Sequence, residues 1–120
     1  MKEYQLQKAV CKYLDLQGYL YCASMNGQYQ KYHSQRNKAK ATGLKRGVPD
    51  LFIYEPIKKY ESDEYWHGLA IELKVGYNKP TEDQWYWNEQ LNKRDYISEI
   101  CYDLDNAISV IETYMGGYIK

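Results

Sequence analysis

Residues 68–74 read Gly-Leu-Ala-Ile-Glu-Leu-Lys, and the fold prediction starts from this stretch. Its alternation predicts a β-strand in which Glu72 and Lys74 project from one face and apolar residues from the other. A second short strand is predicted over residues 51–54, directly after a Pro-Asp pair. If these two strands pair as a hairpin, Asp50 at the start of one lies near Glu72 on the other.

Helical spacing and capping signals predict the other elements. Apolar residues repeat at helical spacing over residues 3–17, and Gly18 is a stop signal. Thr81 and Gln84 form a capping-box pattern, and Asp103 is an N-cap candidate. The predicted elements are helix 3–17, strand 19–23, strand 51–54, strand 68–74, helix 81–94, strand 96–102 and helix 103–115. This order, α-β-β-β-α-β-α, indicates an α/β fold with a mixed sheet flanked by helices.

Two long connections remain between these elements. Residues 26–47 are polar and contain three glycines, so we interpret them as one long loop of the kind that is usually functional or mobile. Residues 55–67 are charged and surround Pro56, which we interpret as a hairpin loop.

The net charge of zero hides an asymmetry between the two halves of the chain. Residues 1–49 contain nine basic and two acidic residues, whereas residues 50–120 contain seven basic and fourteen acidic ones. Such polarity favours a basic surface for a polyanion, although a solvated lysine-rich loop would have the same composition. The candidate DNA-binding residues are Lys31, Arg36, Lys38, Lys40, Lys45 and Arg46.

Composition also argues against several classes of protein. No apolar run approaches the roughly 20 residues of a membrane span, and the N-terminus lacks a signal-peptide stretch. Three widely spaced cysteines without a C-x-x-C pattern indicate reduced thiols in an intracellular protein, and no His/Cys spacing indicates zinc. No phosphate-binding G-x-x-x-x-G-K loop is present, which argues against ATP dependence.

Asp50 and Glu72 are the candidate metal-binding residues. Asp50 and Glu72 together would form a hard, oxygen-rich site suited to Mg²⁺ or Mn²⁺. With Lys74 beside them, such a site suits phosphodiester cleavage, in which one bound metal suffices and a second could assist the leaving group. The alternative is an ordinary half-buried strand whose charged residues form a surface pair worth about 0.2–1 kcal/mol.

Four motifs together give the chain a family resemblance. They are Glu3 with Gln7, the approach Gly43-Leu44-Lys45-Arg46-Gly47-Val48-Pro49-Asp50-Leu51, Ile71-Glu72-Leu73-Lys74, and Thr81-Glu82-Asp83-Gln84. In this order they resemble the virus-type replication-repair nuclease (VRR-NUC) domain of the PD-(D/E)XK nuclease superfamily. The resemblance covers nearly all of residues 1–120 and implies one nuclease domain with a restriction-endonuclease-like fold.

The resemblance implies a role for each matched residue. Asp50, Glu72 and the main-chain carbonyl of Leu73 would bind the metal, and Lys74 would be the catalytic lysine. Glu3 would help to hold the metal, often through water. Gln7 and Gln84 resemble supporting active-site residues, although Gln84 as a plain helix cap and Gln7 as a solvated helix position remain alternatives. One departure is the turn at residues 92–95, where the family commonly has a glycine.

The resulting hypothesis is a Mg²⁺- or Mn²⁺-dependent endonuclease that acts on structured or branched DNA. The consecutive aromatics Trp85, Tyr86 and Trp87 cannot all face one core, and together with the small size they favour a homodimer. The cysteine pattern and the lack of an apolar span predict a cytoplasmic protein without a membrane partner, with a phage or virus as one source. The alternatives are a non-catalytic DNA-binding module on the same fold and a protein-interaction domain, and RNA also remains open as a substrate.

Overall fold

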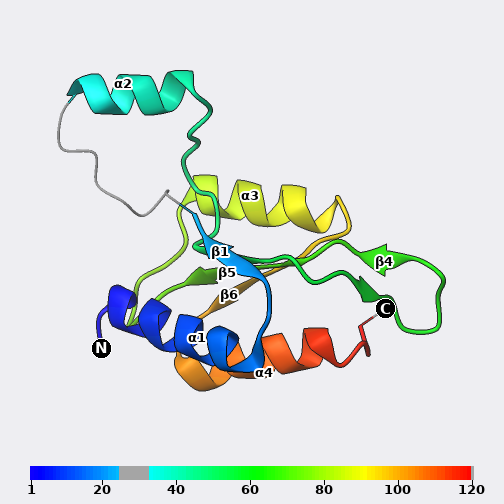
Figure 1. Ribbon diagram of the computed structural model, residues 1–120. Helices are drawn as coiled ribbons and strands as arrows, with labels where there is room; N and C mark the ends of the chain where they lie inside the picture. Colours follow the sequence, from blue (N-terminus) through cyan, green and yellow to red (C-terminus); the bar gives the residue numbers. More distant parts are fainter. Residues whose placement is uncertain (25–32, 120) are drawn as a thin grey trace.

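The computed structural model describes residues 1–24 and 33–119 and has a four-stranded mixed sheet with helices on both faces (Figure 1). The elements are α1 (Glu3–Gln17), β1 (Tyr21–Ala23), α2 (His33–Ala41), β2 (Leu51–Ile53), β3 (Ile57–Lys58), β4 (Tyr65–Trp66), β5 (Leu69–Leu73), α3 (Glu82–Asn92), β6 (Ile97–Cys101) and α4 (Leu104–Met115). The strand order is β1-β2-β5-β6, antiparallel except for the parallel pair β5–β6. The predicted fold class, a mixed sheet flanked by helices, is therefore confirmed.

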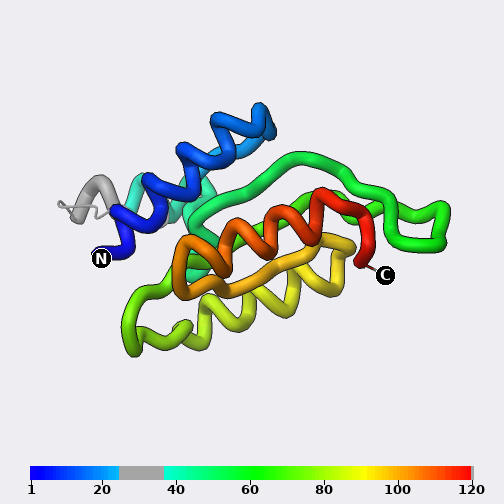
Figure 2. The backbone as a smooth tube through the Cα atoms, turned by 90° about the horizontal axis from the view of Figure 1, so that it is seen from below, coloured from blue at the N-terminus to red at the C-terminus, as the bar shows by residue number. Residues whose placement is uncertain are grey.

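Helices α1 and α4 cover one face of the sheet, and α3 covers the other (Figures 1 and 2). The main core lies under α1 and α4, because their apolar stripes meet the side chains of β2 and β5 there. Its fully buried helical residues are Leu6, Val10, Leu14, Ala107, Ile111 and Tyr114. The helical periodicity of both segments predicted this burial.

The register of β2 against β5 determines where the acidic residues lie. Leu51 pairs with Ile71 in this antiparallel ladder, so the next position along it sets Asp50 opposite Glu72. The predicted pairing of these two strands is confirmed. The odd-numbered residues of β5 join the α1–α4 core, which directs Glu72 and Lys74 to the face covered by α3.

The interpretation of residues 26–47 as one long loop is wrong, because α2 occupies His33–Ala41. This segment has no apolar stripe, so hydrophobic periodicity does not reveal it, and its helix-favouring alanine, lysine, arginine and glutamine content is the remaining signal. The helix ends at Thr42 and Gly43, where Gly43 has a φ of 103° and the Thr42 hydroxyl donates to the carbonyl of Lys38 at 2.8 Å. Figure 1 shows α2 standing apart from the sheet.

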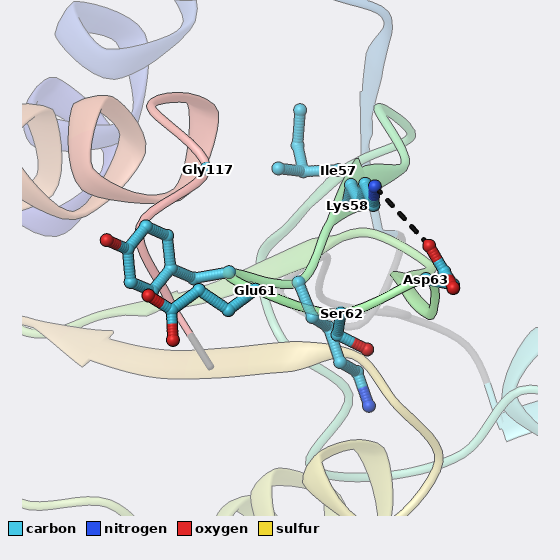
Figure 3. Close-up of a pocket in the computed structure, with 8 residues that line it drawn as sticks. Ile57, Lys58, Glu61, Ser62, Asp63 and Gly117 are labelled. Carbon is cyan, nitrogen blue, oxygen red and sulfur yellow. Dashed lines mark ion pairs between the residues drawn. The ribbon is translucent and has the colours of Figure 1, made fainter.

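The connection at residues 55–67 is itself a small hairpin, formed by β3 and β4, and not only a loop. At its tip Lys58 Nζ lies 3.6 Å from Asp63 Oδ1 (Figure 3). The C-terminal segment packs against it, since the backbone N–H of Tyr60 donates to the carbonyl of Ile119 at 2.9 Å. Strands of two residues carry too little pattern to be predicted from sequence.

In the turn before β6, Asp95 takes the left-handed backbone conformation for which a glycine was expected. Asp95 has a φ of 63°, in the left-handed region that favours glycine. Aspartate tolerates this conformation better than most residues. Its carboxylate accepts from Lys59 Nζ at 2.9 Å, and its carbonyl accepts from the His67 N–H at 2.7 Å. Contacts on both sides of Asp95 therefore hold the turn.

We expect Asp95→Ala to be less stable than the wild type, because alanine tolerates the left-handed backbone less well than aspartate and loses the contact with Lys59. Asp95→Gly relieves the backbone cost and should lie closer to the wild type. Urea denaturation of both variants measures this difference. Equal stability of the two variants would contradict the account of this turn.

Candidate active site

A pocket of about 260 Å³ lies where the N-terminal ends of α1 and α3 meet the ends of β2 and β5. It is lined by Glu3, Tyr4, Gln7, Asp50, Glu72, Leu73, Lys74 and Gln84. Helix α1 contributes three of these residues, β5 and its continuation another three, and the first turn of α3 contributes Gln84. All seven catalytic and metal-binding candidates predicted from the sequence thus lie in one pocket.

Backbone contacts from both neighbouring strands fix Asp50. Its Oδ2 accepts a hydrogen bond from the Leu73 N–H at 2.7 Å, and its carbonyl accepts from the Ser24 N–H at 2.8 Å. In an extended strand the N–H and C=O of one residue point to the same side. The Leu73 carbonyl therefore faces the Asp50 side of β5, as a shared metal site would need.

Glu72 and Lys74 are buried side by side, with only 6% and 8% of their surfaces exposed. Lys74 Nζ lies 3.7 Å from Glu72 Oε2, and Gln84 Nε2 donates to the same oxygen at 3.3 Å. Glu72 Oε1 has no hydrogen-bond partner among the described residues. The interpretation of this strand face as solvated is therefore wrong, because α3 covers it.

Burial, with a further contribution from the nearby Asp50 carboxylate, raises the pKa of Glu72 to about 8. Within this total, Lys74 opposes the upward shift of the pKa, and Glu3 adds a smaller upward effect. Without a cation, the pocket therefore favours a protonated Glu72 at neutral pH. A carboxylate held in such surroundings is typical of functional sites.

Gln84 has both of the roles considered for it. Thr81 and Gln84 form the predicted capping box, in which the Thr81 N–H donates to Gln84 Oε1 at 2.9 Å and the Gln84 N–H donates to Thr81 Oγ1 at 3.2 Å. The amide nitrogen of the same side chain reaches Glu72. The start of α3 is thus tied directly to the carboxylate pair.

The oxygen atoms that line this pocket fit a hard divalent cation. Oxygen ligands are available from Asp50, Glu72 and the Leu73 carbonyl. The buried Oε1 of Glu72 has no partner among the described residues, as expected for a metal ligand in the absence of the metal. Glu3 is exposed at the rim. Among the described residues no group of three or more His, Cys, Asp or Glu side chains is arranged to hold a metal. Water would have to complete the coordination, as is usual for Mg²⁺.

The basic candidates lie outside this pocket. Lys38 and Lys40 are exposed on α2, and Lys45 and Arg46 are exposed on the loop that leads to Asp50. Lys31 and the side chain of Arg36 lie outside the described residues. The loop side chains line a second pocket against α3, together with aromatic residues.

Sequence reasoning missed Tyr4, which is 67% exposed at the pocket rim. A neighbouring cleft of about 440 Å³ continues from it along α1 towards β1, lined by Tyr4, Gln7, Lys8, Cys11, Ala23, Ser24 and Asp50. The spacing of Tyr4, Lys8 and Cys11 was the available signal, because i, i+4 and i+7 share one helix face.

Comparisons with known proteins give a consistent picture of the fold. No family model matches the chain, and no curated protein does. Among solved structures, one described as a "VRR_NUC domain protein" superposes with a TM-score of 0.71 at 29% identity, covering 99% of this chain and 92% of that one. The fold of this chain is therefore similar to that of a VRR-NUC domain. A second structure, described as a "VRR_NUC domain", has a TM-score of 0.60 at 19% identity and covers 93% of this chain and 96% of its own.

The predicted VRR-NUC resemblance is thus confirmed over nearly the whole chain, and with it a nuclease-type fold. In the described part of this VRR-NUC fold, no helix has the length and apolar character that crossing a membrane requires.

The raised pKa of Glu72 predicts a pH-dependent stability in the presence of a chelator. The folded state keeps the Glu72 proton up to about pH 8, whereas the unfolded chain loses it near the ordinary glutamate value. Stability from this group is therefore complete at low pH and is lost as pH rises through that window, by up to about 1.4 kcal/mol per pH unit. In chemical denaturation between pH 5 and 8, the free energy of unfolding should fall less steeply with pH for Glu72→Gln than for the wild type. Parallel pH profiles of the two proteins would contradict the raised pKa of Glu72.

Proposed function

We propose that residues 1–120 form a Mg²⁺- or Mn²⁺-dependent endonuclease domain that hydrolyses phosphodiester bonds in DNA. The observation that carries this proposal is the buried Glu72, whose free carboxylate oxygen lies in one pocket with Asp50 and Lys74. Burying such a charged group is costly unless cations pair with it, and Lys74 pairs only with its other oxygen, Oε2. The VRR-NUC fold supports the same reaction class.

In this proposal, Asp50, Glu72 and the Leu73 carbonyl hold the metal, with Glu3 acting through water. The metal would supply charge neutralisation at the phosphoryl oxygens and a lowered pKa for bound water. The hydrogen bond from the Leu73 N–H orients Asp50 before any substrate arrives. The chain thus positions its ligands through rigid strand ends.

Lys74 is the proposed catalytic lysine, and its role depends on its buried positive charge. Its ammonium group lies beside Glu72 and can donate to the attacking water or to a phosphate oxygen. Gln84 holds Glu72 in place through its amide nitrogen. Gln7 lines the same pocket one helical turn from Glu3 and would contact substrate or ligand water.

In this proposal, the basic residues within 1–49 bind the DNA backbone. Helix α2 stands apart from the sheet and carries the exposed Lys38 and Lys40, while Lys45 and Arg46 lie nearer the pocket. Phosphate contacts of this kind position a duplex without reading its sequence. Lys31 and Arg36 complete the proposed basic set.

Neutralising Lys38, Lys40 and Arg46 together should weaken DNA binding regardless of sequence. The slope of log K against log salt should become shallower by about 0.9 for each phosphate that the variant no longer neutralises. Lys58→Gln is the matched control, because this lysine lies on the β3–β4 hairpin and is paired with Asp63. An unchanged slope in the triple variant would mean that these residues are merely solvated.

Three finer features belong to the same proposal. We propose branched DNA as the substrate and a homodimer as the working form, since paired cuts need two active sites and Trp85 is 52% exposed on α3. A sedimentation mass equal to one chain at micromolar concentration would contradict the dimer. We also propose an intracellular setting, with a phage-infected host as one case, in keeping with the free thiols of all three cysteines.

The deciding experiment incubates end-labelled duplex, nicked, flap, single-stranded and four-way DNA with the protein. Each substrate is tested with Mg²⁺, with Mn²⁺ and with chelator. We expect metal-dependent cuts that favour the branched substrates. DNA binding without any cleavage would instead support the non-catalytic module, and absence of binding would support the protein-interaction alternative.

A further inference from the structure

A second pocket, of about 600 Å³, lies between α3 and the loop that leads to Asp50. Its chemically distinctive lining residues are Lys45, Arg46, Tyr86, Trp87, Gln90 and Arg94. Its volume is within the range of small-molecule sites. The cations come from the loop and from the turn that follows α3, and the aromatic rings come from the middle of α3.

The pocket forms because the backbone of the loop at Gly47 lies against the start of α3 at Asp83. Gly47, with a φ of 86°, is buried, and any Cβ at this position would come closer than 3.0 Å to Asp83. This contact fixes Lys45 and Arg46 over α3. Arg94 is held in turn, because its Nη1 donates to Gln90 Oε1 at 2.6 Å and to the Gln90 carbonyl at 3.1 Å.

The chemistry of this lining matches one ligand class. Three cations against the single acid Asp83 select a polyanion, and Tyr86 is 60% exposed, which leaves its ring open for stacking. Aromatic rings beside cations are how proteins bind unpaired nucleotides, because every base has a flat face. A duplex base pair cannot use such a ring, since its own faces are already stacked.

We propose that this pocket binds an unpaired nucleotide of the DNA next to the cleavage site. Arg46 and Asp50 are four residues apart, so their Cα atoms are separated by at most about 14 Å. Asp83 and Gln84 also connect the two pockets along α3. A single-stranded segment seated on Tyr86 thus lies within a few nucleotides of the carboxylates. This inference rests on the proposed nuclease function and specifies its substrate as a junction between duplex and single strand.

The test measures affinity in chelator, so that cleavage plays no part. The probes are a blunt duplex and the same duplex with a single-stranded extension, followed by fluorescence anisotropy. We expect the wild type to prefer the extended probe and Tyr86→Ala to lose about 5- to 100-fold in affinity for it, while its affinity for the blunt duplex stays unchanged. Tyr86→Phe keeps a ring and should behave as the wild type.

Lys93→Gln is the matched control, since Lys93 is exposed beside α3 and does not line the pocket. Arg94→Gln should resemble Tyr86→Ala, whereas Lys93→Gln should not. Equal wild-type affinity for both probes, or an equal loss in Lys93→Gln, would overturn the inference and leave the nuclease proposal standing. A dimer that dissociates on Tyr86→Ala would overturn it too, by making the pocket an interface. Absence of DNA binding by the wild type would instead count against the nuclease proposal itself.

Discussion

Glu72→Gln is expected to reduce metal-dependent DNA cleavage at least about 100-fold, because glutamine keeps the shape of the side chain but removes an anionic ligand. The buried Oε1 of Glu72 has no other partner among the described residues, whereas Oε2 pairs with Lys74, so the loss of this ion pair has to be separated from the loss of a metal ligand. Initial rates on a labelled four-way junction, at several Mn²⁺ concentrations, measure the effect.

The matched control is Glu99→Gln. Glu99 lies on β6 opposite Ile71 and outside the pocket; its side chain is exposed, although partial desolvation raises its pKa as well. Its variant should cleave at the wild-type rate. Retained metal-dependent cleavage in Glu72→Gln would refute the site, and a loss of cleavage in both variants would show that the assay reports stability and not chemistry. Chemical denaturation in chelator separates these outcomes.

Gly47→Ala is expected to destabilise the protein by about 2–4 kcal/mol. An alanine there has an unfavourable positive φ and also collides with the backbone of Asp83 at the start of α3. The same collision would push the loop off α3 and disturb the approach to Asp50. DNA affinity in chelator should therefore fall along with stability.

Gly43→Ala provides the control for the backbone cost alone. Gly43 has a φ of 103°, but no atom lies within 4 Å of a Cβ built on it. We expect this variant to lose only about 1 kcal/mol. Urea denaturation of both variants measures the difference, and a Gly47→Ala variant as stable as Gly43→Ala would contradict the close approach.

The sequence allowed the site to be predicted because its residues lie on strongly patterned elements. The alternation around Glu72 and the Pro-Asp step before β2 bring their carboxylates together at the register in which Leu51 pairs with Ile71. The helical period of α1 placed Glu3 and Gln7 on one face. Local pattern placed these residues on their elements, whereas the site roles of Glu3 and Gln7 came from the VRR-NUC resemblance.

The features that escaped prediction depend on contacts between distant segments. Helix α2 has no apolar stripe, so only its intrinsic propensity marked it. The burial of Glu72 and Lys74 follows from α3 covering that face of the sheet, which an alternating strand does not reveal. The second pocket exists because the loop at Gly47 touches Asp83, and neither residue indicates this contact in the sequence.

Manganese binding tests the central claim most directly, because every proposed step depends on the cation held by Asp50 and Glu72. Electron paramagnetic resonance of free Mn²⁺ gives the amount bound as protein is added. The wild type and Glu99→Gln are expected to bind alike, whereas Asp50→Asn and Glu72→Gln should each lose at least about tenfold in affinity. Wild-type Mn²⁺ affinity in both of these variants would contradict the account.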